Sequence, residues 1–168
     1  MGTEEHRKHA AAHLNIGIVT LSSTRTLAED KSGCWIGEQA RAEGHEIVFH
    51  RVFPDNPEII RKTVRDLIGG HEPDAILLTG GTGISPGDLT IEAVQPLFEK
   101  ELTAFAVLFA QLSFEEIGAA AVLSRATAGV IGKTLVFCMP GSLKACQLAC
   151  KSLIFPELGH MMKHIRDG

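Results

Sequence analysis

Short apolar runs alternate with helix-like segments along most of this chain, and this alternation limits the folds that the chain can adopt. The apolar runs cover residues 15–21, 45–53, 74–78 and 133–139. Runs of this length between polar or glycine-rich segments indicate buried strands. Strands that alternate with helices predict a three-layer α/β fold: a doubly wound, mostly parallel sheet with helices on both faces.

Capping residues set the bounds of the predicted helices. Asp30 is a suitable N-cap for a helix over residues 31–43, which Gly44 would end. Asn56-Pro57 offers an N-cap and a first-turn proline for a second helix, which should stop at Gly69-Gly70. Further helical segments are predicted from residue 90 with an interruption near Pro96, over residues 101–112, and from a cap at Ser142 to residue 155, where Pro156 would break or restart the helix.

The composition suits a chain with one hydrophobic core. Of the 168 residues, 45% are hydrophobic and 21% are charged, which is the balance of an ordinary globular domain. Residues 1–13 are polar and rich in His and Glu, so we expect them to form a flexible N-terminal tail. Residues 14–168 are expected to form a single domain.

Charge, hydropathy and cysteine usage argue against several classes of protein. The chain has 16 Lys and Arg against 20 Asp and Glu, and this net charge of -4 argues against general binding of nucleic acid or of an anionic membrane surface. No run approaches the ~18 uninterrupted apolar residues of a membrane span, so none is expected. The four cysteines form no Cys-x-x-Cys pair, which favours reduced thiols in the cytoplasm.

A glycine-rich loop follows the third predicted strand and reads Thr79-Gly80-Gly81-Thr82-Gly83. Glycines let the backbone turn tightly and point several amides in one direction, which suits a phosphate. Asp88 follows closely and would repel a phosphate unless a metal ion lay between them, so the pattern indicates a nucleotide-type ligand held with Mg²⁺. The alternative is a tight strand-to-helix turn without a ligand. The spacing matches neither the dinucleotide fingerprint nor the P-loop.

Polar segments follow the other predicted strands and should meet the glycine loop. In parallel sheets, ligands bind beyond the carboxyl ends of the strands, which here carry residues 22–24, Pro54-Asp55, the glycine loop and Pro140-Gly141-Ser142. Two carboxylates at this edge, Asp55 and Asp88, would repel each other, and a divalent cation bound between them would offset this electrostatic repulsion. Each also has a purely structural alternative, since Asp55 suits a turn and Asp88 could cap the following helix.

Two basic residues could bind an anion at the same edge. Arg125, after Ser124, could hold a phosphate through two parallel hydrogen bonds, with a surface salt bridge as the alternative. Lys144 lies in the first turn of the last predicted helix, where a cation opposes the helix dipole unless an anionic partner is present. His160 and His164 share a helix face, but the sequence supplies no further metal ligands near them, so we expect a solvated helix there.

Several motifs together resemble the MoaB/MogA family of molybdenum cofactor biosynthesis proteins. They are the glycine loop with Asp88, Ser-Arg-Ala-Thr-Ala-Gly-Val at residues 124–130, and Met-Pro-Gly-Ser-Leu-Lys-Ala at residues 139–145. Residues 112–118, Arg25 and Asp30-Lys31-Ser32-Gly33 are most similar to the MoaB branch. The resemblance covers nearly all of residues 14–155.

The resemblance implies a single molybdopterin-binding domain that assembles into homo-oligomers, either trimers or, in the MoaB branch, hexamers. Active members join molybdopterin to AMP from ATP with Mg²⁺ and release pyrophosphate, whereas other members lack this activity. Asp55 and Asp88 match the two aspartates tied to Mg²⁺ and catalysis. The implied ligand-binding residues are Thr79, Gly80, Gly81, Thr82, Gly83, Ser124, Arg125, Pro140, Gly141, Ser142 and Lys144.

One segment departs from the family pattern. Relatives usually carry Gly-Phe-Gly-Glu and then an Arg where this chain has Ala104-Phe105-Ala106-Val107 and Ala110, so a Glu and an Arg are absent. Residues 102–112 are apolar on nearly every side, and such a helix must be buried all round. We expect it to pack into a subunit interface or to fill part of the pocket. The chain is therefore either an adenylyltransferase or an inactive molybdopterin-binding or assembly protein, with a nucleotide pyrophosphatase as a third option.

Overall fold

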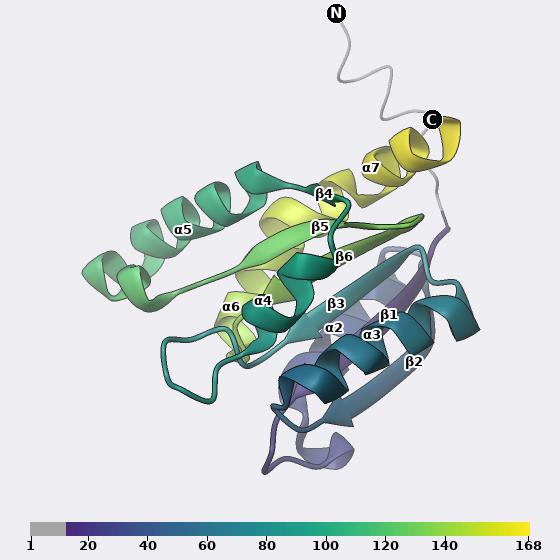
Figure 1. Cartoon of the computed structure of the whole chain (residues 1–168). Coiled ribbons are helices and arrows are strands. Elements are labelled where there is room, and N and C mark those ends of the chain that lie inside the picture. Colours follow the sequence, from purple (N-terminus) through teal and green to yellow (C-terminus); the bar gives the residue numbers. More distant parts are fainter. Residues whose placement is uncertain (1–12) are drawn as a thin grey trace, which may run out of the picture.

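The computed structural model describes residues 13–168, so the predicted tail at residues 1–13 lies outside the described residues except for His13. A six-stranded sheet forms the centre of the domain, in the order β2-β1-β3-β6-β5-β4 (Figure 1). The first four strands in this order are parallel, whereas β5 and β4 are antiparallel at one edge. The strands are β1 (Asn15–Leu21), β2 (Glu46–Phe53), β3 (Ala75–Thr79), β4 (Lys100–Glu101), β5 (Thr127–Ile131) and β6 (Thr134–Met139).

Helices cover both faces of this sheet, because side chains of alternating positions in each strand point to opposite sides. Ile16 and Ile18 of β1 pack in the core that α2, α5, α6 and α7 cover, whereas Val19 and Leu21 face α3 and α4. The α-helices are α2 (Lys31–Ala42), α3 (Pro57–His71), α4 (Thr90–Val94), α5 (Thr103–Ile117), α6 (Leu143–Ala149) and α7 (Phe155–Asp167). The predicted three-layer, mostly parallel α/β fold is thereby confirmed.

Shorter helical turns connect these elements. The 3-10 segments are η1 (Leu27–Glu29), η2 (Gln95–Leu97) and η3 (Gly118–Leu123), and a π-helical turn, Cys150–Ile154, joins α6 to α7. Ser142 caps α6 by accepting a hydrogen bond from the amide of Ala145, as predicted. Pro156 lies in the first turn of α7, where it has no intrahelical hydrogen bond to lose, so the helix restarts there.

The structure differs from the local predictions in two places. The helix α3 does not stop at Gly69-Gly70 but continues to His71, and Glu72 follows it in a left-handed conformation, directly before Pro73. Proline cannot continue a helix, so Pro73 sets the end and the two glycines remain inside the last turns.

The second difference is the antiparallel edge, because β5 is not among the four predicted strands. The strand β5 pairs with β6 through a tight connection at Gly132, which has a φ of 59°. Gly129 lies inside β5 because the ring of Phe98 occupies the place where a Cβ would stand. Small residues at such a close approach hide the alternating pattern of a strand.

Candidate functional site

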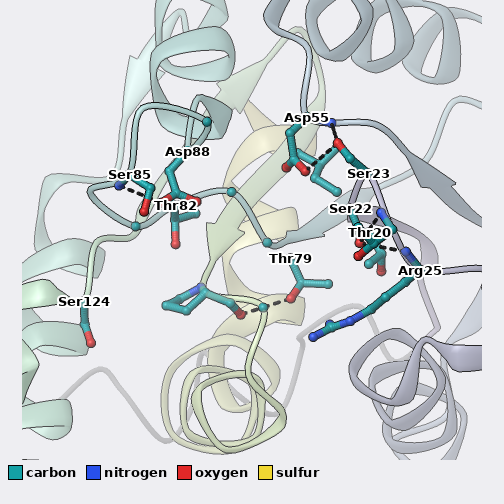
Figure 2. A pocket seen from close by; sticks show the side chains of 18 of the residues that line it. Thr20, Ser22, Ser23, Arg25, Asp55, Thr79, Thr82, Ser85, Asp88 and Ser124 are labelled. Atoms are coloured by element: carbon teal, nitrogen blue, oxygen red, sulfur yellow. Dashed lines mark hydrogen bonds between the residues drawn. The ribbon is translucent and has the colours of Figure 1, made fainter.

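A cavity of about 620 Å³ opens at the carboxyl ends of β1, β3 and β6 (Figure 2). The polar segments that follow the strands meet there, as the parallel topology predicts. The residues that line it are Thr20, Leu21, Ser22, Ser23, Thr24, Arg25, Asp55, Thr79, Gly80, Gly81, Thr82, Gly83, Ser85, Gly87, Asp88, Leu123, Ser124, Pro140 and Gly141.

The glycine loop is held rigidly at the centre of this cavity. Gly80 and Gly81 have φ values of 98° and 63°, which residues other than glycine rarely adopt. Thr90, at the start of α4, donates its hydroxyl to the carbonyl of Gly80 at 2.8 Å and its amide to that of Gly81 at 3.0 Å. A Cβ on Gly141 would lie 3.2 Å from the Cα of Gly80, so the glycine loop packs closely against the loop that follows β6. The loop therefore needs no ligand to adopt its shape.

The amides of this loop are not equivalent. The amide of Gly80 donates to the carbonyl of Met139 at 3.1 Å, so it serves the fold and is not available to a ligand. Within residues 13–168, no hydrogen bond occupies the amides of Gly81, Thr82 and Gly83. The amides that remain available for a phosphate are therefore those of the last three residues of the loop.

Asp55 and Asp88 lie on either side of the glycine loop (Figure 2). Asp55 accepts a hydrogen bond from the hydroxyl of Ser23 at 3.2 Å, and its Oδ1 would be 2.9 Å from a Cβ on Gly81. Asp88 accepts from the amide of Ser85 at 2.8 Å and does not cap α4. The two carboxylates thus approach the loop from both sides, and both line the cavity.

The donor set decides how these carboxylates could hold a metal ion. Across residues 13–168 there is no group of three or more His, Cys, Asp or Glu side chains that could hold a metal ion by themselves. Mg²⁺ characteristically takes one or two carboxylates and completes its shell with water and substrate phosphates. Asp55 and Asp88 fit that pattern, which requires a phosphate-bearing ligand in the cavity.

Arg25 is a further candidate site residue, which in the sequence carried only the family resemblance. It is the only cation among the described residues that line the cavity. Ser22 shapes the loop that carries it, because the Ser22 hydroxyl accepts from the amides of Thr24 and Arg25 at 3.3 and 3.1 Å. Its place directly after a predicted strand end could have marked it as a site residue.

Arg125 and Lys144 lie outside the lining. Arg125 donates its Nε to the carbonyl of Thr82 at 2.9 Å and its other nitrogens to Glu92 at 2.7 Å. It therefore ties the glycine loop to α4, while its neighbour Ser124 does line the cavity. Lys144 borders a separate cavity of about 510 Å³ between α5 and α6, and the side chain of Ser142 caps α6.

Buried polar side chains support the floor of the cavity. Thr79 donates its hydroxyl to the carbonyl of Pro140 at 3.0 Å, and the Cys146 thiol lies 3.2 Å from the same hydroxyl. Below Thr20, the fully buried carboxylate of Asp30 is bonded to three donors, one of them on His50. Burial opposes the charge, but the hydrogen bonds from His50, Thr20 and Gly33 together hold the pKa of Asp30 below its ordinary value.

Comparison with known proteins identifies the family of this chain. Residues 17–160 match the family model described as a probable molybdopterin binding domain. Molybdenum cofactor biosynthesis protein B of Bacillus subtilis is 43% identical over 167 residues, covering 99% of this chain and 98% of that protein. A probable molybdopterin adenylyltransferase of Methanocaldococcus jannaschii is 36% identical, covering 93% of this chain and 96% of that protein.

Solved structures with the same fold are also similar in sequence. A crystal structure of a molybdenum cofactor biosynthesis protein B superposes with a TM-score of 0.90 at 41% identity, covering 93% of this chain and 98% of that chain. The tungsten cofactor synthesizing protein MoaB from Pyrococcus furiosus superposes with a TM-score of 0.81 at 37% identity, covering 94% and 99%. The predicted resemblance and the predicted fold are both confirmed.

Proposed function

This chain belongs to the family of probable molybdopterin binding domains, and from that membership we propose that it acts in molybdenum cofactor biosynthesis, where it binds molybdopterin and adenylylates it with ATP and Mg²⁺. The observation that carries the proposal is the cavity in which a rigid glycine loop lies between Asp55 and Asp88, with Arg25 on the same lining. The name of the Methanocaldococcus jannaschii relative, a probable molybdopterin adenylyltransferase, supports the transfer of AMP.

The proposed reaction joins two polyanions. An oxygen of the molybdopterin phosphate attacks the α-phosphorus of ATP, the new P–O bond forms, and the bond to the leaving pyrophosphate breaks. Alignment and neutralisation of charge dominate the barrier of such a step. When bound, Mg²⁺ would neutralise charge on the phosphate oxygens.

The residues of the cavity would divide this work. Asp55 and Asp88 would hold the metal ion from the two sides of the loop. The amides of Gly81, Thr82 and Gly83 would bind phosphate oxygens, and Arg25 would bind a further anionic group. Thr79, Gly80, Ser124, Pro140 and Gly141 would shape the walls, while Arg125 would keep the loop in place through Thr82 and Glu92.

The departure from the family pattern does not reach this cavity. Ala104, Ala106, Val107 and Ala110 lie on α5, and none of them lines the cavity of the same chain. The helix α5 therefore does not fill the cavity, whose two carboxylates and glycine loop are intact. This observation favours the adenylyltransferase over the second candidate, an inactive protein that binds molybdopterin or assists its assembly.

One incubation separates the candidates. The purified protein is mixed with molybdopterin, ATP and MgCl₂, and the products are followed by mass spectrometry and by release of pyrophosphate. Adenylylated molybdopterin supports the enzyme. Binding of molybdopterin without that product supports the second candidate and contradicts the first. Release of pyrophosphate from ATP without molybdopterin would instead indicate a nucleotide pyrophosphatase.

The exposed apolar surface of α5 supports assembly with further copies of the chain. Only Phe105, Phe109 and Ser113 of this helix are buried, although it is apolar nearly all round. Val107, Leu108, Phe114 and Ile117 are 66%, 45%, 62% and 52% exposed, and Val122 in η3 is 83% exposed. Several large exposed apolar side chains on one helix and the turn after it favour an interaction site. We propose that it is covered in a homo-oligomer, a trimer or a hexamer.

A membrane is the other environment that could cover this surface. Among residues 13–168, one helical stretch, Thr103–Leu123, is long and apolar enough to cross a membrane by length and composition. However, the α-helix ends at Ile117 after 15 residues, and it contains Glu115 and Glu116 in its last turn. A helix of that length spans ~22 Å, short of a hydrocarbon core of about 30 Å, and buried carboxylates are costly. A second copy is therefore the favoured partner.

The cysteines support a reducing compartment such as the cytoplasm. All four carry free thiols, and Cys138, Cys146 and Cys150 are buried. Burial raises the pKa of these three thiols, so they stay protonated and act as small apolar side chains. The exposed thiol of Cys34 has no disulfide partner among the residues of the structure.

A further inference from the structure

We propose that His50 is a positioning residue for the cavity. Through Asp30 it holds together the two ends of the loop over residues 21–29, and this loop carries Ser22, Ser23 and Arg25 into the cavity. The inference rests on the proposed function in one respect, since it assumes that the cavity binds a phosphate-bearing ligand.

The carboxylate of Asp30 joins three elements. Its Oδ2 accepts a hydrogen bond from the hydroxyl of Thr20 at 2.5 Å and lies 2.7 Å from Nε2 of His50. Its Oδ1 accepts from the amide of Gly33 at 2.9 Å, which caps α2. Thr20 is the last residue but one of β1, and Asp30 is the N-cap of α2, so their hydrogen bond closes the loop at its neck.

His50 supplies the donor that comes from outside this loop. Asp30 is fully buried, and a buried carboxylate is stable only when hydrogen-bond donors satisfy it. Thr20 and Gly33 flank the loop itself, whereas His50 reaches the carboxylate from the middle of β2. A Cβ on Gly33 would collide with both Asp30 Oδ2 and His50 Nε2, so the glycine leaves the room that this hydrogen-bonded pair needs.

The loop above this neck is bonded within itself by Ser22 and by the Thr26–Glu29 pair, but few hydrogen bonds tie it to the rest of the domain. The amide of Ser22 donates to the carbonyl of Phe53 at 2.8 Å, and Ser23 and Asp55 exchange hydrogen bonds at 3.2 and 3.3 Å. The side chains of His50 and Arg51, with part of the same loop, border a small cavity of about 440 Å³ beneath it. Without His50, this space lets water reach Asp30 and the neck loosens. Arg25 and the Ser23 partner of Asp55 then lose their fixed positions.

Two substitutions separate positioning from plain packing. His50→Ala removes the donor, whereas His50→Gln keeps an N–H donor on a side chain of similar reach. His164→Gln is the matched control, because His164 is exposed on α7. That helix is anchored by Arg166 to Asp74, which precedes β3 at the opposite end of the sheet from the cavity.

The test measures the affinity for inorganic pyrophosphate in the presence of MgCl₂ by calorimetry, together with hydrogen exchange and thermal unfolding. We expect His50→Ala to weaken binding by up to about tenfold, because ordering the loosened loop would then cost part of the free energy that this hydrogen bond contributes. Amides of residues 22–29 should exchange faster, while those of β3 stay unchanged. His50→Gln should restore most of the affinity, and His164→Gln should match the wild-type protein.

Other results would overturn the inference. Wild-type affinity in His50→Ala, or equal losses in His50→Ala and His50→Gln, would reduce His50 to a packing residue. If His50→Ala does not fold, Thr20→Val removes the hydrogen bond from β1 to Asp30 instead. This variant must then raise the rate of hydrogen exchange at the amides of residues 22–29. The exchange measurement needs no ligand, so absence of pyrophosphate binding by the wild-type protein would count against the proposed function and leave the positioning role to be decided by exchange.

Discussion

The carboxylate of Asp88 packs directly on the backbone of Gly83. A Cβ on Gly83 would lie 2.6 Å from Oδ2 of Asp88, which real side chains do not permit. Because Ser85 also donates its amide to the same oxygen at 2.8 Å, the carboxylate is fixed relative to the loop before any ligand arrives. Preorganised groups of this kind contribute most to transition-state stabilisation.

Replacing Asp88 by Asn should therefore affect turnover more than affinity. Loss of one preorganised electrostatic group costs ~10²–10³-fold in rate, and we expect a fall of that order in the formation of adenylylated molybdopterin. Steady-state kinetics with ATP and Mg²⁺ measure it. Asp66→Asn on the exposed face of α3 is the control. Unchanged turnover in Asp88→Asn would remove Asp88 from the catalytic assignment.

Replacing Arg25 by Ala should weaken ligand binding more than it slows the reaction of bound substrate. A charge-assisted hydrogen bond contributes ~1.5–3 kcal/mol, so the affinity for pyrophosphate or ATP should fall roughly ten- to hundredfold. Calorimetric titration provides the measurement. Arg125→Ala offers a comparison outside the lining, since it should act through the glycine loop and reduce stability as well. Equal affinity in Arg25→Ala and wild type would contradict the role given to Arg25.

Replacing Phe114 by Asp should dissociate the oligomer. Phe114 is 62% exposed on α5, and a carboxylate there would be buried without a partner in an interface. Light scattering should record a mass near the 18.1 kDa of one chain for this variant and a multiple of it for the wild-type protein. Ile59→Asp on α3 is the control. A wild-type monomer, or one that floats with lipid vesicles, would speak against assembly through α5.

Acid should remove the stabilisation that Asp30 provides. Because the folded-state pKa of Asp30 lies below its ordinary value of about 4, the ionised carboxylate stabilises the fold above that pH, and the contribution is lost as the pH falls through the folded value. The difference in unfolding free energy between wild type and Asp30→Asn should therefore shrink on acidification below about pH 4. Denaturant unfolding at several pH values measures it, and a difference that stays constant would refute the linkage.

Much of the fold follows from local sequence patterns. The strand β1 and the N-caps at Asp30 and Asn56 depend on residues that are close in the sequence, and the structure confirms them. The strand β5 was missed because it contains Gly129. A glycine is needed there because the ring of Phe98, which is distant in the chain, packs against its backbone. A pattern within β5 cannot reveal a constraint that arises only when two segments pack.

The candidate site divides in the same way. Asp55, Asp88 and the glycine loop could be predicted to share an edge, because the carboxyl ends of parallel strands must meet. The pairing of Arg125 with Glu92 and that of Asp30 with His50 could not, since each joins residues from different elements through their side chains. Which basic residue faces the cavity is likewise decided by tertiary packing.

In the proposed homo-oligomer, the turn η3 that follows α5 would make the cavity depend on protein concentration. The turn η3 ends with the exposed residues Val122 and Leu123 and is followed by Ser124, and both Leu123 and Ser124 line the cavity. A neighbour that covers η3 would therefore also hold one wall of the cavity in place. Activity per chain would then be lost on dilution, and the cell would have a functional enzyme only above a threshold amount of this protein.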